Sequence, residues 1–343
     1  MPVPSLPFEL IDLILSHLVS PISLAPPRFY RDLCSAALVC RSWAAVAQKL
    51  LWEQIYLSGG DEQVEQWLAV DFRPGWKVKA LVLTEQESAR GEGTEWTNAR
   101  FLQLFDRCGG ISRFSCTLCL EKLSKEAPDF LLQSFPALEH VGLAHPPALD
   151  SKQQFFPSTV KSFAFLPLEP LQHNAPYSSA ATLAMLLAES QEQGHLALTR
   201  LKVEDLIVLR HLAVVAPSLR TLVLPSEPPN FYSTSTRSGE LATFLAVCRN
   251  LTRLVVPFLW DAKLVAAVPP SVTHLDIGIV TANAFCAFCR AFERLSQSWT
   301  SVVQLRIQHP RNDKRFENMM ELWGKVEQSC GSRGIEVVVS VRR

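Results

Sequence analysis

The 343-residue sequence lacks both a charge bias and a long hydrophobic run. Its 33 Lys and Arg equal its 33 Asp and Glu, so the formal net charge is zero. A basic surface for nucleic acid is therefore not expected over the whole protein, although a local patch would be compatible with a neutral total. No stretch of about 18 uncharged apolar residues occurs, because even residues 206–216 include Arg210 and His211. We expect neither a nucleic-acid partner nor a membrane.

An export signal is missing as well. The first apolar stretch, residues 8–18, follows no basic segment and is interrupted by Glu9 and Asp12. Nine cysteines, an odd number, in a chain without such a signal indicate reduced thiols and not a disulfide framework. We expect a soluble protein of the cytoplasm, the nucleus or both.

Motifs for catalysis and phosphate binding are also absent. The sequence has no Gly-x-Ser-x-Gly, no His-Glu-x-x-His and no Gly-x-x-x-x-Gly-Lys, and it contains only 14 glycines. His17 and His211 lie in stretches with helical periodicity, and we interpret them as structural residues and not as bases. We expect no enzymatic activity and no cofactor, although an unfamiliar active site would leave no such motif.

Two Cys-x-x-Cys pairs, Cys116 with Cys119 and Cys286 with Cys289, are the one pattern that suggests a metal, since four thiolates can bind zinc. The first pair lies on an expected strand, where residues three apart point to opposite faces. The second pair lies in an apolar helical segment, residues 284–292. We interpret all four as structural thiols and expect no metal.

Helical periodicity is present from residue 5 to residue 57. A Pro-interrupted segment, residues 20–29, separates the first apolar helix from a second helical stretch over residues 33–47, and a short element over residues 50–55 follows. Ser5 is a candidate N-cap, with Pro7 in the first turn. The apolar positions of the first helix, at spacings of three and four, are Leu10, Ile11, Ile14, Leu15 and Leu18.

Beyond Gly59 and Gly60 a second pattern begins, in which short apolar-x-x-apolar-x-apolar segments alternate with helical ones. Each strand and helix leaves apolar surface that only a neighbouring unit can bury, which predicts a solenoid. Several intervals fit the roughly 20 to 29 residues of a leucine-rich repeat, and others require a longer helix or an inserted loop. The segments are residues 78–83, 111–116, 138–143, 160–165, 198–203, 219–224, 251–256, 272–277 and 302–307, with a final strand at 334–341.

The N-terminal segment contains four short tracts in a characteristic order: Leu6-Pro7-Phe8-Glu9-Leu10, Ile14-Leu15 with Leu18, Leu38-Val39-Cys40-Arg41-Ser42-Trp43, and Leu51-Trp52. Together they resemble an F-box, with a longer Pro-rich linker over residues 20–31 than that family usually has. The resemblance implies a three-helix module that docks on the Skp-type adaptor of a cullin-RING ubiquitin ligase. Carried over residue by residue, the expected adaptor contacts are Leu6, Pro7, Leu10, Ile14, Leu15, Leu18, Leu38, Val39, Cys40, Trp43, Leu51 and Trp52.

An alternative is that the same residues pack an N-terminal helical cap onto the first repeat, and periodicity alone does not separate the two. A bundle of about 50 residues can hardly bury so many apolar side chains in itself, so some are expected to face a partner. The predicted fold class is α/β, with a small three-helix F-box over residues 1–58 and an irregular leucine-rich-repeat-like solenoid over residues 59–343.

The strands of such a solenoid line a concave face, and the residues that flank the buried apolar positions point out of it. Here these residues are mostly basic or polar, which suits an acidic or phosphorylated segment of a protein. A solvated face without a ligand is the alternative. The candidate substrate-binding residues are Arg200, Lys202, Arg253, His274, Asp276 and Arg306.

The combined expectation is the substrate-recognition subunit of an SCF-type E3 ubiquitin ligase. Its partners would be the Skp-type adaptor, cullin through that adaptor, and a protein substrate, with the chemistry performed by other subunits. A non-degradative interaction scaffold of leucine-rich-repeat type shares the same sequence features and is the alternative. An enzyme built on the repeat region is the third class.

Overall fold

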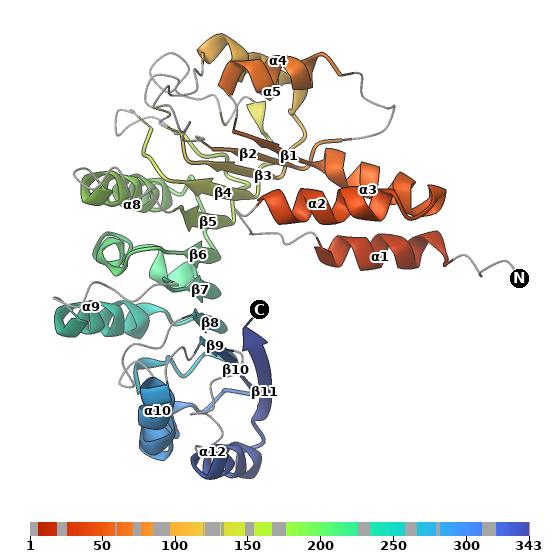
Figure 1. The fold of residues 1–343 in the computed structure, drawn as a ribbon. Coiled ribbons are helices and arrows are strands. Elements are labelled where there is room, and N and C mark those ends of the chain that lie inside the picture. The colour runs from red at the N-terminus through yellow and green to blue at the C-terminus, as the bar shows by residue number, and fades with distance from the viewer. Residues whose placement is uncertain are drawn as a thin grey trace, which may run out of the picture. The chain divides into compact units, whose positions relative to one another are not determined.

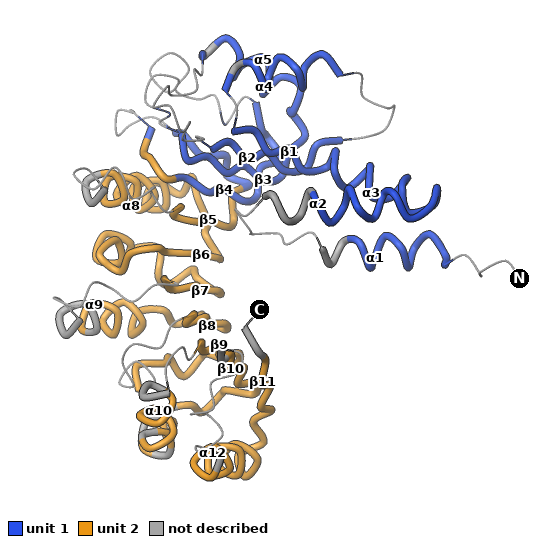
Figure 2. Tube along the Cα trace, viewed as in Figure 1, with its two compact units in different colours: residues 1–143, 147–159 blue, residues 144–146, 160–343 orange. Residues whose placement is uncertain are grey.

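A computed structural model of the chain divides into two compact units (Figure 2). The first comprises Met1–Leu143 with Pro147–Thr159, and the second comprises Ala144–Pro146 with Val160–Arg343. The structure describes residues 6–18, 26–58, 60–70, 77–84, 97–118, 120, 131, 134–147, 154–166, 176–225, 234–257, 266–278, 282–310 and 320–342.

The first unit begins with three helices, α1 (Phe8–Leu18), α2 (Pro26–Ala37) and α3 (Arg41–Glu53) (Figure 1). They enclose one apolar core, to which α1 contributes Ile11 and Leu15, spaced one helical turn apart. The three helices of the sequence prediction are therefore present. The other buried members of this core are Leu33, Ala36, Val46, Ala47 and Leu50.

Two details of that prediction were wrong. The second helical stretch does not run through to residue 47, because α2 closes with N–H bonds from Leu38 and Val39 to the carbonyls of the preceding turn, and Cys40 is extended (φ −166°). The short element over residues 50–55 is not a unit either. Its first part is the last turn of α3, and Ile55 belongs to a strand, β1 (Gln54–Leu57).

The Pro-rich linker is shorter than expected, because α2 already begins at Pro26. A proline is well suited to the first turn of a helix, where its missing N–H has no partner to lose. Residues 20–25 of the linker and the candidate cap Ser5 lie outside the described residues.

The remaining described strands of the first unit follow β1 in parallel. Ile55, Leu81, Phe114 and Val141 lie in register across them, all buried. Phe105 packs edge-on against Phe114, with ring centroids 5.8 Å apart. The elements are β2 (Ala80–Leu83), β3 (Arg113–Cys116) and β4 (His140–Leu143), with the helices α4 (Gly60–Leu68) and α5 (Asn98–Arg107).

The second unit repeats a strand and a helical connection, and α8, α9 and α10 lie on the same side of its strands (Figure 1). The described strands are β5 (Ser162–Phe165), β6 (Arg200–Lys202), β7 (Thr221–Val223), β8 (Arg253–Val256), β9 (His274–Gly278), β10 (Gln304–Pro310) and β11 (Glu336–Arg342). The described helices are α8 (Pro176–Glu192), η2 (Leu206–His211), η3 (Ala216–Ser218), α9 (Thr234–Val247), α10 (Ala282–Leu295), η6 (Ser296–Ser298) and α12 (Met320–Ser332).

All ten strands predicted from the apolar spacing are confirmed, and β1 is an addition to them. Within each unit the described neighbouring strands are parallel and follow the chain order. The predicted α/β fold class, three helices followed by parallel strand–helix repeats, is therefore confirmed.

Register in the second unit is fixed by apolar residues and by main-chain bonds just before each strand. A column of leucines lies in register across β6 to β10, each at most 1% exposed: Leu201, Leu222, Leu254, Leu275 and Leu305. Burying each such side chain contributes roughly 1.5 to 3 kcal/mol. Because the column only forms between neighbours, stability accrues from repeat to repeat.

The residue before each strand also ties successive repeats together. The carbonyl of Thr199 accepts the N–H groups of both Arg220 (2.7 Å) and Thr221 (3.0 Å). The same residue type donates a side-chain bond backwards: the hydroxyl of Thr252 donates to the Arg220 carbonyl and that of Thr273 to the Thr252 carbonyl, each at 3.1 Å. These hydroxyl bonds were not predicted from the sequence.

We predict that Gly278→Ala destabilises the protein. Gly278 ends β9, and a Cβ atom there would overlap the main-chain carbonyl of Pro257, which cannot move aside as a side chain can. Overpacking of this kind costs about 1 to 3 kcal/mol, to be measured by chemical denaturation. The control is Gly324→Ala in α12, where a Cβ meets no atom within 4 Å. Equal stability of the two variants would contradict the predicted overlap with the Pro257 carbonyl.

Candidate functional site

Helix α1 is apolar on two faces. One face carries Ile11 and Leu15 and is buried in the three-helix core. On another face Leu10, Leu13 and Ile14, spaced three and four residues apart, are 45%, 55% and 43% exposed. A helix that packs only against the core of its own module needs one apolar stripe. The second stripe therefore indicates a surface that another protein covers.

The turn between α2 and α3 exposes a second group of apolar side chains. Leu38 is 87% exposed and Val39 is 63% exposed, and Cys40 beside them is also exposed. Leu38 and Val39 lie in the turn that closes α2, and Cys40 is the extended residue before α3. Leu6 and Pro7, which directly precede α1, are exposed too.

The structure divides the twelve expected adaptor contacts by burial. Leu6, Pro7, Leu10, Ile14, Leu38, Val39 and Cys40 are exposed, whereas Trp43 and Leu51 are partly buried against the three-helix core. Trp52 is half-buried. Leu18 ends α1, and its side chain lies outside the described residues.

Leu15 requires a correction. Its side chain is 0% exposed, and a side chain without accessible surface cannot contact a partner in this conformation. We therefore assign Leu15 to the core of the module and not to the adaptor surface. Leu13 and Phe8 were missed, although both are at least half exposed. The spacing of Leu13 from Leu10 could have identified it, because residues three apart share a helical face.

The candidate substrate-binding residues lie in two rows on strands of the second unit. Residues of the first row occupy equivalent positions at the start of each strand, and residues of the second row lie two positions further along. The first row is Arg200, Thr221, Arg253, His274 and Gln304, and the second is Lys202, Val223, Val255, Asp276 and Arg306. Their flanking leucines are buried, so these rows form the opposite strand face.

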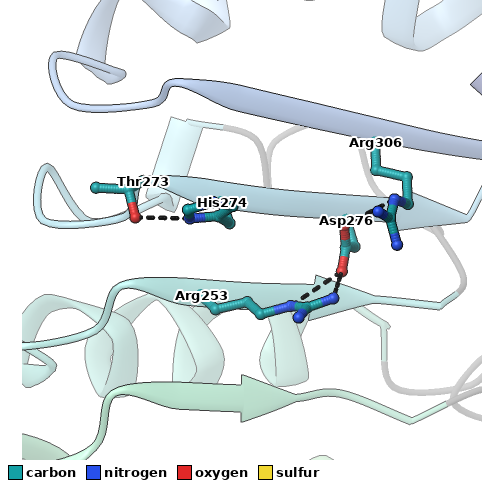
Figure 3. A network of polar contacts seen from close by, with 5 residues as sticks. All are labelled: Arg253, Thr273, His274, Asp276 and Arg306. Carbon is teal, nitrogen blue, oxygen red and sulfur yellow. Dashed lines mark hydrogen bonds and ion pairs between the residues drawn. The ribbon is translucent and has the colours of Figure 1, made fainter. Parts of the chain in front are cut away.

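Asp276 is the centre of a polar network that joins three strands (Figure 3). Its Oδ2 accepts bonds from Arg253 Nη2 at 2.6 Å and Nε at 3.2 Å, and its Oδ1 lies 3.9 Å from Arg306 Nε. Asp276 is only 7% exposed, whereas about half of the Arg253 side chain and two fifths of the Arg306 side chain are accessible. A buried carboxylate is costly unless it is paired, and here two guanidinium groups pair it.

The basic character expected of this face is thus partly cancelled. Lys202 pairs with Glu204 at 2.6 Å, and both arginines share Asp276. His274 Nδ1 lies 2.9 Å from the hydroxyl of Thr273, at the edge of the network (Figure 3). Two guanidinium groups against one carboxylate leave one positive charge at the Asp276 network.

Three of the four cysteines of the Cys-x-x-Cys pairs lie in the described residues. Cys116 and Cys289 are buried, Cys286 is half-buried, and Cys119 lies outside the described ranges. Burial raises the pKa of Cys289 to about 12, and the neighbouring Cys286 adds to the effect, so this thiol stays protonated at neutral pH. Across the described ranges no three His, Cys, Asp or Glu side chains gather closely enough to hold a metal ion.

A comparison with protein families identifies the three-helix module. Residues 3–58 match the F-box-like family model, and these residues comprise the three helices and β1. No curated protein matches the sequence at a significant level. The chain therefore has an F-box-like domain at its N-terminus, followed by a long parallel strand–helix repeat region that is consistent with leucine-rich repeats.

An F-box domain implies binding to a Skp-type adaptor, and proteins that contain one are typically non-catalytic adaptors. None of the helices in the described part of the chain has the length and uninterrupted apolar sequence needed to span a bilayer.

Thiol labelling tests the exposed turn. We predict that iodoacetamide labels Cys34 and Cys40 in the native protein and that adaptor binding slows the reaction at Cys40. Cys34 is exposed on α2 but is not among the expected contacts, so it serves as the reference. Site-resolved mass spectrometry gives each rate. Equal protection of both thiols, or of neither, would contradict the assignment of Cys40 to the interface.

Labelling of the buried cysteines and the stability of the fold are both expected to depend on pH. Burial raises the pKa of Cys108, Cys248 and Cys289 to about 12 and that of Cys330 to about 11. The thiolate is the reactive form, so these four stay unlabelled in the native state even near pH 9, where about half of an ordinary thiol is ionised. Their protonation stabilises the folded state below about pH 9, and this contribution is lost as the pH rises toward 11 to 12.

Proposed function

We propose that this protein is the substrate-recognition subunit of an SCF-type E3 ubiquitin ligase. Residues 1–58 would be the F-box that binds the Skp-type adaptor, and residues 59–343 the repeat domain that binds the substrate protein. The observation that carries the proposal is the set of exposed apolar side chains on a module whose residues 3–58 match the F-box-like model.

The energetics support this assignment of the surface. Each large apolar side chain that becomes buried contributes roughly 1.5 to 3 kcal/mol, so Leu10, Ile14, Leu38 and Val39 together offer several kcal/mol to a partner. Scattered exposed leucines are common, but a second stripe on one helix and an almost fully exposed Leu38 are not. We retain Leu6, Pro7, Cys40, Trp43, Leu51 and Trp52 as further candidate contacts, Leu18 on the resemblance alone, and add Leu13.

The strand rows of the second unit support the second half of the proposal. They carry the candidate residues Arg200, Lys202, Arg253, His274, Asp276 and Arg306, which we propose as contacts to the substrate. Chemistry on the substrate would be performed by other subunits of the ligase. Because strand order places residues of distant sequence side by side, this face can bind a segment without a dedicated pocket.

Adaptor binding is predicted to depend on surface residues and not on the core. Leu10→Gln with Ile14→Gln, and separately Leu38→Gln with Val39→Gln, should each weaken adaptor binding about tenfold or more, because apolar burial is lost. Co-purification with the adaptor and cullin, followed by titration, measures the effect. These side chains are exposed, so the thermal stability of the free chain should be unchanged.

Leu102→Gln is the matched control, since Leu102 is exposed on α5 outside the F-box-like residues. Core variants such as Leu15→Ala would not serve, because a cavity costing about 2 to 5 kcal/mol would unfold the module and abolish binding indirectly. Failure of the wild-type chain to bind the adaptor would refute the F-box proposal. Binding of the adaptor without cullin would favour the non-degradative scaffold.

Charge reversal tests the strand face. Arg200→Glu with Arg306→Gln, which leaves the Arg253–Asp276 pair intact, should strongly weaken capture of substrate proteins while adaptor binding is retained. Quantitative mass spectrometry of proteins recovered with the adaptor-bound receptor measures the loss. The control reverses Arg249, Arg290 and Arg294, which are exposed on the turn after α9 and on α10. Equal recovery by wild type and the first variant would exclude this face as the binding surface.

A further inference from the structure

The Asp276 network is preorganised for an anion. The buried carboxylate accepts hydrogen bonds from Arg253 of β8 and forms an ion pair with Arg306 of β10 at 3.9 Å, so the Arg253 guanidinium is already ordered and that of Arg306 is drawn to the same place before a ligand arrives. Each guanidinium has five N–H donors, and the contacts to Asp276 use only some of them. The unmatched positive charge and the remaining donors suit a carboxylate or phosphate, which arginine binds with charge-assisted bonds.

An apolar pair lies beside this network in the same row. Val223 and Val255 are in register on β7 and β8, and both are half-buried. The next residue along the row is Asp276 on β9. The apolar pair on β7 and β8 is therefore followed along the row by Asp276 and Arg306, where the two guanidinium groups gather. Lys202 on β6, paired with Glu204, borders the apolar pair on its other side.

The spacing of the two features matches an extended peptide. Neighbouring strands are about 4.8 Å apart, so the midpoint of the valine pair lies one and a half strand spacings, about 7 Å, from Asp276. In an extended chain that crosses the strands, side chains two residues apart point the same way and are separated by about 6.6 to 6.8 Å. Two alternate side chains of one peptide can therefore contact both features at once.

Resting on the function proposed above, we propose that the face of β7 to β10 binds an extended segment of the substrate protein with an apolar residue and an anionic residue two positions apart. The apolar side chain packs on Val223 and Val255. The anionic side chain, a carboxylate or a phosphate, binds Arg253 and Arg306, which Asp276 holds in place. The strand face thus selects a local pattern of charge and hydrophobicity.

Fluorescence anisotropy with labelled synthetic peptides tests this proposal on the full chain bound to its adaptor. The probes are twelve-residue Gly/Ser/Ala peptides that contain Leu-x-phosphoserine or Leu-x-Glu, in both orders. We expect them to bind about tenfold more tightly than peptides that lack the Leu, lack the anion, or separate the two by four residues. Binding of the phosphoserine peptides alone identifies a phosphorylated segment, and binding of both identifies any acidic one. Equal affinity for peptides with the Leu and the anion two and four residues apart would overturn the proposal.

Two variants connect that binding to the named residues. Arg306→Gln should weaken the Leu-x-phosphoserine peptide about tenfold, because a charge-assisted bond is lost while the Arg253–Asp276 pair remains. Val223→Thr with Val255→Thr should weaken it by a similar factor through lost apolar contact. Arg290→Gln, on α10, is the control. Unchanged peptide binding in both test variants would refute the proposed site.

Adaptor binding is scored in the same samples, so the two proposals fail separately. If the chain binds adaptor and cullin but no patterned peptide, the recognition pattern is wrong and the ligase function stands. If the chain binds no adaptor, the ligase function is wrong, and the peptide titration on the chain alone still decides whether the strand face recognises the pattern.

Discussion

The main-chain bonds between successive parallel strands are the constraint on which the rest of the structure depends. A parallel strand cannot satisfy its N–H and C=O groups within its own repeat, so each repeat requires the next. In the second unit the carbonyl before each of β5 to β9 accepts two consecutive N–H groups, and threonine hydroxyls reinforce the contact at β7 and β8. Register is thereby fixed, and equivalent residues align in rows although the connections between strands differ in length.

The alignment of equivalent residues from successive repeats gives the two faces of the strands their different character. On one side the leucine column excludes water, and on the other side polar residues from different repeats come within bonding distance of each other. Arg253, Asp276 and Arg306 meet only because β8, β9 and β10 pair in this register. The same contacts that satisfy the buried carboxylate of Asp276, hydrogen bonds from Arg253 and an ion pair with Arg306, also gather two guanidinium groups at the surface, so stability and recognition depend on one set of contacts.

The strands could be predicted because their apolar spacing is local in sequence, and the contacts between them could not. Strand β1 was missed because Ile55 was grouped with the short helical element over residues 50–55, and only the pairing with β2 shows that Gln54–Leu57 is a strand. The pairing of Asp276 with two arginines requires the register across connections of unequal length. Periodicity likewise gives α1 two apolar faces without saying that the one with Leu15 is buried.

The burial of Leu15 and the exposure of Leu10, Leu13 and Ile14 show how one short helix can serve two roles. A three-helix module of this size has a small core, and its stability depends on the face of α1 that carries Ile11 and Leu15. The other face contributes nothing to that core and is free to bind a partner. Core and surface substitutions in α1 would therefore give the same loss in a binding assay for different reasons. Only a stability measurement on the free chain separates a broken module from an intact module that has lost its binding surface.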